Sequence, residues 1–405
     1  MAMNRREFVK MMGLGVGYSM LRFGHGGMAF ASDAPVDKHL IVIMMRGAVD
    51  GLSIVVPYNE QAYYKNRPNI AIQRSEVLTL DERFGLHPSL APLMPLWTNK
   101  SMAFVHASGS PAETRSHFEA QDIMETASEH PGSTGWMNRL VQILPDTNSS
   151  TRALSFGNTL PRIFEGSYNV ATVPRGIKGG NGKMAFDNPK VGGAFDSLYK
   201  NNPELHSLYK DAVSSREEMV ADLNEEMTAA SKDAAKPDEF VNQCEKLAKM
   251  MSRDAKIQLA FMDVGGWDTH INQGNAKGQL ANKLEKLGTA LAALCQGLGD
   301  RYKDTTIVVM SEFGRTVAEN GNQGTDHGHG NVMWLFGGNV AGGKVWGQWP
   351  GLEQTQLHEA RDLAVTTDYR SVIGQVLVSQ FKLSPEQVSK VLNTYTPAPD
   401  LNGLV

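Results

Sequence analysis

The chain has 405 residues, of which 41% are hydrophobic and 20% charged, as expected of a globular protein with a substantial core. Its formal net charge is −4, and no basic block occurs beyond the N-terminus. This charge gives no electrostatic reason for binding nucleic acid, so we expect no nucleic-acid partner.

The N-terminal stretch NRREFVKMMGLGVGYSML (4–21) resembles a twin-arginine export signal, with Arg5 and Arg6 before a weakly apolar, glycine-rich run. The tripeptide AFA (29–31) has the small-x-small pattern of a cleavage site. The alternative is a mobile basic N-terminus. The apolar run is too short and too broken by glycine to span a membrane. We therefore expect a signal peptide over 1–31, recognition by the twin-arginine export machinery, a periplasmic or otherwise exported location, and no stable membrane span in the mature protein.

Residues 32–405 are predicted to form one α/β domain. Continuous apolar runs, typical of strands buried on both faces, occur at HLIVIMMRG (39–47), SMAFVHASG (101–109), KIQLAFMDVGG (256–266), TTIVVMSEFG (305–314) and GNVMWLFGG (330–338). Helical patterns alternate with them at 87–97, 116–128, 135–144, 279–298 and 368–381. This alternation predicts a doubly wound, mainly parallel sheet flanked by helices.

An insertion is predicted over about 151–255. Residues 151–200 are rich in Gly, Asn and Pro, and charged helical stretches follow at 204–232 and about 237–252. Cys244 and Cys295 both fall in helical segments, far apart in sequence. A disulfide and two buried free thiols both remain open, and neither cysteine has metal-ligand spacing.

Carboxylates and imidazoles follow the ends of several predicted strands, where ligands of open α/β sheets bind. Each signal alone has a plain structural explanation. Asp50-Gly51 suits a turn, WDTH (267–270) suits a helix cap, and Glu312 could pair with Arg315. Together they favour a metal site with one or two divalent ions, such as zinc or manganese, because mixed carboxylate and imidazole ligands suit these ions. The predicted ligands are Asp50, Asp268, His270, Glu312, His327 and His329.

Five motifs resemble the twin-arginine-exported DUF1501 family: RGAVDGL, SHFEAQDIME, GGWDTH, SEFGRT and DHGHGN. The resemblance runs from the export signal to about residue 395. The motif order is similar to that of the alkaline phosphatase and sulfatase superfamily. This similarity implies an alkaline phosphatase-like fold over 32–405 and a metal-dependent enzyme that hydrolyses or transfers a phosphate or sulfate ester.

The superfamily resemblance implies roles for particular positions. Asp50, Asp268 and His270 match ligand positions, and His327 or His329 can be the final ligand. The resemblance also implies an adjacent Asp-His pair where this chain has Glu312 and then Phe313. The missing imidazole leaves a second metal in question, unless the second histidine of DHGHGN compensates.

Three residues are predicted to act on a small anionic ester substrate: Ser116, His117 and Arg315. Ser116 lies at a predicted helix N-terminus, which favours an anion, and matches the superfamily's nucleophile. The same location equally predicts a plain helix cap. His117 and Arg315 could contact the anion, or Arg315 could neutralise nearby carboxylates. The alternative function is a non-catalytic metal- or anion-binding protein, or a cell-surface interaction protein, that keeps the fold.

Overall fold

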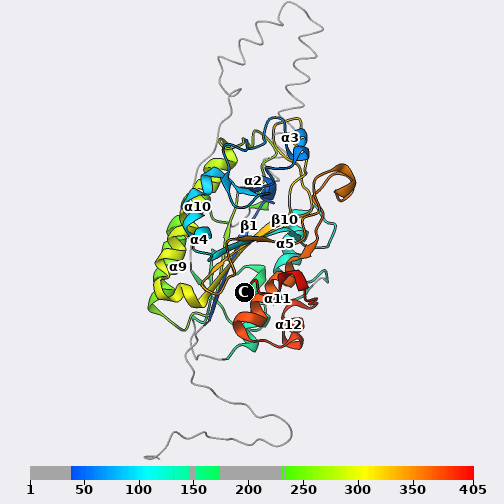
Figure 1. The fold of residues 1–405 in the computed structure, drawn as a ribbon. Coiled ribbons are helices and arrows are strands. Elements are labelled where there is room, and N and C mark those ends of the chain that lie inside the picture. Colours follow the sequence, from blue (N-terminus) through cyan, green and yellow to red (C-terminus); the bar gives the residue numbers. More distant parts are fainter. Residues whose placement is uncertain (1–37, 131, 146–150, 174–227, 229, 232–233) are drawn as a thin grey trace, which may run out of the picture. The chain divides into compact units, whose positions relative to one another are not determined.

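The structure is a computed structural model, and it describes residues 38–130, 132–145, 151–173, 228, 230–231 and 234–405 (Figure 1). The predicted signal peptide over 1–31 and almost all of the helical stretch 204–232 lie outside these residues. Within the described part of the chain, no helix is long and apolar enough to cross a membrane.

The described strands form a nine-stranded central sheet with the order β11-β5-β10-β9-β1-β8-β6-β7, in which β12 also pairs with β5. The strands are β1 (His39–Met45), β5 (Met102–Gly109), β6 (Ala153–Phe156), β7 (Ala171–Val173), β8 (Leu259–Val264), β9 (Thr305–Ser311), β10 (Asn331–Gly337), β11 (Lys344–Trp346) and β12 (Thr367–Asp368). Neighbouring strands are parallel except around β10, which runs antiparallel to both β5 and β9. The predicted mainly parallel sheet is confirmed, and the reversed β10 is an addition that the sequence did not reveal.

Helices cover both faces of the sheet, as a doubly wound fold requires (Figure 1). Side chains of β1 alternate between two cores, with Ile41 and Ile43 in one and Leu40 and Val42 in the other. The first core is covered by η1 (Pro88–Leu93), α4 (Met94–Thr98), α9 (Pro237–Arg253) and α10 (Gln279–Gly297). The second is covered by α5 (His117–Thr126), α6 (Trp136–Ile143), α11 (Tyr369–Phe381) and α12 (Pro385–Leu392).

A small region follows β1 and carries a second sheet, with the order β2-β4-β3. Its elements are α2 (Gly51–Ile54), β2 (Val55–Val56), α3 (Gln61–Asn66), β3 (Leu78–Thr79) and β4 (Gly85–Leu86). Short 3-10 turns complete the described elements: η2 (Arg162–Phe164), η4 (Gly299–Asp304), η5 (Gln354–Gln356) and η6 (Pro399–Leu401).

The described ends of the predicted insertion belong to the main layers. Strands β6 and β7 extend the sheet beyond β8, and α9 packs against α10. Residues 174–227 lie outside the described structure, so the extent of an insertion over 151–255 stays a prediction. Cys244 in α9 and Cys295 in α10 are both buried and both free.

The direction of β10 gathers the motif-bearing loops at one edge of the sheet. Strands β1, β5, β8 and β9 end at this edge, whereas β10 begins there because it runs the opposite way. The DHGHGN segment, which immediately precedes and enters β10, therefore meets the loop that follows β9. An antiparallel bridge between Arg315 and His327 joins the two loops.

The two loops approach so closely that they need glycine. The Gly314 N–H donates to the carbonyl of His329 at 2.8 Å, and the Gly328 N–H donates to the carbonyl of Gly314 at 2.9 Å. A Cβ added at Gly314 would lie 1.8 Å from the Gly330 carbonyl oxygen. Any side chain at this position would therefore force the loops apart.

We expect Gly314→Ala to lower the free energy of unfolding by about 2 kcal/mol or more, because the overlap is with backbone that cannot move aside. Chemical denaturation measures the change. Gly321→Ala is the matched control, since no described heavy atom lies within 4 Å of its added Cβ. Its effect should stay within about 0.5 kcal/mol. Equal stability of the two variants would contradict the close approach of the loops.

Candidate metal centre

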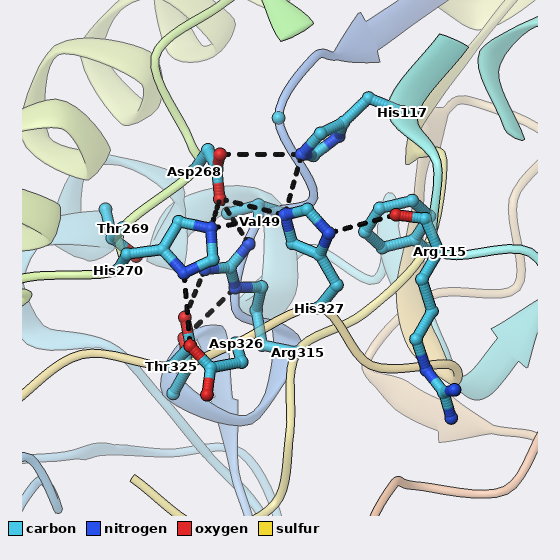
Figure 2. A network of polar contacts seen from close by, with 12 residues as sticks. Val49, Arg115, His117, Asp268, Thr269, His270, Arg315, Thr325, Asp326 and His327 are labelled. Carbon is cyan, nitrogen blue, oxygen red and sulfur yellow. Dashed lines mark hydrogen bonds and ion pairs between the residues drawn. The ribbon is translucent and has the colours of Figure 1, made fainter. Parts of the chain in front are cut away.

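The loop edge of the sheet is organised around Asp268, whose side chain is 0% exposed. It lies just after β8 and is contacted by the imidazoles of His117, His270 and His327 and by the guanidinium of Arg315 (Figure 2). His270 Nε2 lies 2.9 Å from Asp268 Oδ1, His117 Nε2 lies 3.5 Å from Oδ2, and His327 Nε2 lies 3.5 Å from Oδ1. Arg315 Nη1 donates to Oδ1.

The three imidazoles turn the same nitrogen toward one another. His117 Nε2 lies 3.0 Å from His327 Nε2, which in turn lies 3.2 Å from His270 Nε2. The ligand atoms of His117, Asp268 and His327 all lie within 4.8 Å of one another, and this is the group of described residues that could hold a metal ion. His270 adjoins the group through its contacts with Asp268 and His327.

The opposite nitrogen of each imidazole meets an oxygen. His117 Nδ1 lies 2.8 Å from Glu312 Oε1, and His327 Nδ1 lies 2.9 Å from the Arg115 carbonyl. His270 Nδ1 lies 3.2 Å from Asp326 Oδ1. An ionised carboxylate and a carbonyl only accept, so each Nδ1 carries the proton that it donates. A ring without a proton on Nε2 would then be neutral, with its Nε2 lone pair turned toward the other rings, as in a ligand of a cation.

This arrangement fits a small divalent ion. Histidine ligands of metals generally donate their second N–H to a carboxylate or carbonyl, as all three do here. Zinc–nitrogen bonds of about 2.0–2.1 Å in a tetrahedron place neighbouring ligand atoms about 3.3 Å apart. The observed Nε2–Nε2 separations of 3.0 and 3.2 Å are close to that spacing. Imidazole and carboxylate ligands suit both zinc and manganese.

The buried carboxylates and imidazoles of the centre shift the pKa values of one another. Burial would raise the pKa of Asp268, but contacts with the three histidines and the charge of Arg315 lower it far below its usual range. Burial would likewise raise the pKa of Glu312, which His117 lowers to about 2. Burial would lower the pKa of His117, but Asp268 and Glu312 raise it to about 9. Two ionised carboxylates thus flank His117 and favour a cation between them.

The structure brings some of the predicted ligands together and separates others. Asp268, His270 and His327 lie in the cluster, while Glu312 lies behind His117 and orients its ring. Backbone and side-chain donors also hold Glu312, including Gly47 N–H at 2.7 Å. Its position suggests an orienting residue rather than a direct ligand.

Asp50 is not part of the described ligand group. Arg67 grips it through a two-point ion pair, with Nη1 donating to Oδ2 at 2.6 Å and Nη2 to Oδ1 at 3.0 Å. Ser53 and Gln273 also donate to Oδ2, both at 2.7 Å. Protein donors therefore engage both carboxylate oxygens of Asp50, and its role as a ligand stays a prediction.

His329 also lies outside the described ligand group. Its ring stacks on that of His358, with centroids 4.5 Å apart and an interplanar angle of 28°. The doubled histidine of DHGHGN is thus divided, with His327 in the cluster and His329 in a ring pair. Phe313, where the superfamily resemblance implied an imidazole, stacks on His117 with centroids 4.9 Å apart.

The predicted catalytic residues lie in different surroundings. His117, predicted to contact the substrate, is a member of the group that could hold a metal ion. The Arg315 side chain is 0% exposed and bonds Asp268 and Thr325, so its guanidinium does not face solvent. Ser116 is exposed at the N-cap of α5, and within the described structure its hydroxyl makes no capping hydrogen bond.

Three residues at or beside the centre were not among those predicted from the sequence. Asp326 accepts from His270, and its place in DHGHGN was visible although its role was not. Arg67 and Gln273 bind Asp50 from regions without a recognisable motif. No pattern in the sequence signals these two partners.

Fold and site together define an α/β protein with a buried histidine–aspartate centre at the loop edge of its sheet. The sequence profile described as "Protein of unknown function (DUF1501)" matches residues 83–392. The chain belongs to this family. Among curated proteins, none matches the chain.

Several solved structures are remotely similar to the chain. A protein in the alkaline phosphatase superfamily from Vibrio parahaemolyticus is 9% identical with a TM-score of 0.37, and covers 76% of this chain, which spans 62% of that protein. The C-terminal periplasmic domain of EcEptC from Escherichia coli, in complex with Zn, is 8% identical with a TM-score of 0.35 over 76% of this chain and 74% of that one. A 2-O GAG sulfatase is 9% identical with a TM-score of 0.38 over 90% and 72%. At this level of similarity, the roles of residues rest on the contacts described above.

We expect His327→Ala to weaken binding of Zn²⁺ by about hundredfold or more, because it removes one member of the ligand group. Isothermal titration of metal-free protein measures the affinity. His329→Ala provides the control from the same motif and should bind Zn²⁺ like the wild type, since its ring stacks on His358. Loss of affinity in both variants, or in neither, would contradict the assignment.

We expect metal uptake near neutral pH to release at least about one proton per ion, because His117, with its pKa raised to about 9, must lose a proton before it can bind. Affinity should therefore rise with pH up to about 9. Without metal, the raised pKa means that protonated His117 stabilises the fold below its unfolded pKa of about 6.5, and this contribution is lost as the pH rises through about 9. Titrations in buffers of different ionisation enthalpy measure the protons released. An affinity that did not change with pH would refute this coupling.

Proposed function

We propose that the protein is an exported, metal-dependent hydrolase of a small phosphate or sulfate ester. The main support for this proposal is that three imidazole Nε2 atoms converge beside buried Asp268 and that each Nδ1 lies within hydrogen-bond distance of an oxygen. The motif order described above supports the ester class. The N-terminal sequence supports export through the twin-arginine machinery.

A bound divalent ion would supply Lewis acidity toward an ester oxygen or a water molecule. The chain's own residues hold and orient the centre. His117, His327 and Asp268 supply the ligand atoms, and Glu312 and the Arg115 carbonyl fix the ring orientations. The His327 side chain is 13% exposed, compared with 3% for His117 and 0% for Asp268. A substrate therefore reaches the centre most readily on the side of His327.

Ser116 is our candidate nucleophile. It immediately precedes His117 in the chain, and its exposed position at the start of α5 places it beside the first N–H groups of the helix, which have no partner within the helix itself. Those groups and the helix dipole favour negative charge, which suits both an alkoxide and the anion that it would attack. Since its hydroxyl makes no capping bond within the described structure, Ser116 is not committed to a cap.

A second function, non-catalytic metal or anion binding, is favoured by a different observation. The arginines near the strand ends are already engaged. Arg315 is buried against Asp268, and Arg46 pairs with Glu125 and Asp263, both at 2.7 Å. Neither guanidinium faces solvent to clamp an anionic ester during its reaction.

Turnover of an ester panel separates the two functions. Metal-loaded protein should hydrolyse an aryl phosphate or aryl sulfate, and Ser116→Ala should lower kcat by about hundredfold or more if the hydroxyl attacks. Ser252→Ala, an exposed serine in α9, is the control and should leave kcat unchanged. Full activity in Ser116→Ala would remove the nucleophile assignment. Absence of turnover with bound metal would favour the binding protein.

A further inference from the structure

The two oxygens of Asp268 have different surroundings. Oδ1 accepts from Arg315 Nη1 and lies 2.9 Å from His270 Nε2 and 3.5 Å from His327 Nε2. Oδ2 is buried, and among the described residues it has no hydrogen-bond partner. The ion-pair contact of Oδ2 is with His117 Nε2, at 3.5 Å. A buried carboxylate oxygen without a donor is costly, so Oδ2 is the oxygen that a cation would satisfy.

Arg315 is fixed on the other side of this carboxylate. Besides Asp268, it donates from Nε to the Thr325 hydroxyl at 3.1 Å and from Nη2 to the Thr325 carbonyl. Its side chain and that of Asp268 are both 0% exposed. A fully buried, multiply bonded guanidinium cannot move away cheaply, so it permanently occupies the Oδ1 side.

A buried relay of hydrogen bonds holds Arg315 in this position. The Thr325 hydroxyl donates to Gln273 Oε1 at 3.0 Å, and the Thr269 hydroxyl donates to the same oxygen at 2.7 Å. Gln273 Nε2 donates to Asp50 Oδ2 at 2.7 Å. The last member of this series of hydrogen bonds is Arg67, which donates to both carboxylate oxygens of Asp50. Each donor finds an acceptor, which fixes the orientation of the Gln273 amide.

We propose that the centre binds a single divalent ion, at His117, His327 and Asp268 Oδ2, and that Arg315 takes the place of a second ion. Gln273 and Thr325 are then positioning residues, which act on the ion through Arg315 and Asp268. This inference rests on the proposed metal-dependent function and specifies its ion number. It also gives a reason for the saturation of Asp50, the carboxylate predicted to serve a metal.

Electrostatics supports a single ion. A second divalent ion near Asp268 Oδ1 would face the buried guanidinium of Arg315, and one near Asp50 would face that of Arg67. Like charges repel strongly where water is excluded. Asp268 and Asp50 thus each have a guanidinium counter-charge already, which leaves Oδ2 of Asp268 as the oxygen of this pair that a metal could bind.

Metal stoichiometry tests the ion number. Metal-free wild-type protein is titrated with Zn²⁺ and, separately, Mn²⁺, and the bound ions are counted after dialysis. We expect one ion per chain. Two tightly bound ions would overturn the inference, and ester hydrolysis by that species would leave the proposed function standing. Absence of any bound ion would overturn both.

Thr325→Val tests the relay, because it removes the hydroxyl between Arg315 and Gln273 with little change of shape. We expect about tenfold weaker Zn²⁺ binding, still one ion per chain, and a shifted absorption spectrum of the Co²⁺-loaded protein. Thr305→Val is the matched control: this buried threonine begins β9 at the opposite edge of the sheet, and its hydroxyl bonds the Arg301 carbonyl. Its Zn²⁺ affinity and Co²⁺ spectrum should match the wild type.

Gln273→Met tests the next link and should change affinity and spectrum in the same direction. Circular dichroism first establishes that each variant is folded, and thermal unfolding records any loss of stability. A folded Thr325→Val protein whose Zn²⁺ affinity and Co²⁺ spectrum equal those of Thr305→Val would overturn the relay. The Thr325→Val result decides even where Gln273→Met does not fold.

Discussion

The centre depends on the burial of one carboxylate, that of Asp268. A charged carboxylate removed from water needs close positive partners, and this requirement organises the loops around it. Arg315 supplies one partner, and the histidines approach the remaining surface of the group. The same principle operates around Asp50, where Arg67 is the partner. Of these two buried acid–arginine pairs, only that of Asp268 also contacts imidazoles.

The topology of the sheet brings the loops that carry these charged and imidazole side chains to one edge. Ligand-bearing loops would be expected at the carboxyl ends of parallel strands, and Asp268 and His117 follow β8 and β5 accordingly. His327 instead precedes a strand and reaches the same edge only because β10 is reversed. One antiparallel strand thus lets a loop that enters the sheet join loops that leave it.

Much of the fold could be predicted because strands buried on both faces are continuous apolar runs, as in the stretch that forms β1. The direction of β10 could not be predicted, because a buried strand has the same apolar sequence pattern whether it runs parallel or antiparallel to its neighbours. Asp268, His270 and His327 were recognisable from their positions at strand ends. Asp50 fitted the same rule, but nothing local shows that Arg67 will occupy its carboxylate. The sequence could not show that His327 and His329 have different surroundings. Residues two apart lie on the same face of a strand, but in a glycine-containing loop their side chains need not point the same way.

The reversed strand also bears on when the centre can form during synthesis. The cluster joins His117, Asp268 and His327, and β10 must pair with β5 and β9 before the last of these is in place. Domains fold largely as units while the chain emerges from the ribosome, and such distant pairings close slowly. A nascent chain that has already emerged beyond Asp268 still lacks the third imidazole. The complete centre therefore forms only after β10 has been synthesised and has paired with β5 and β9.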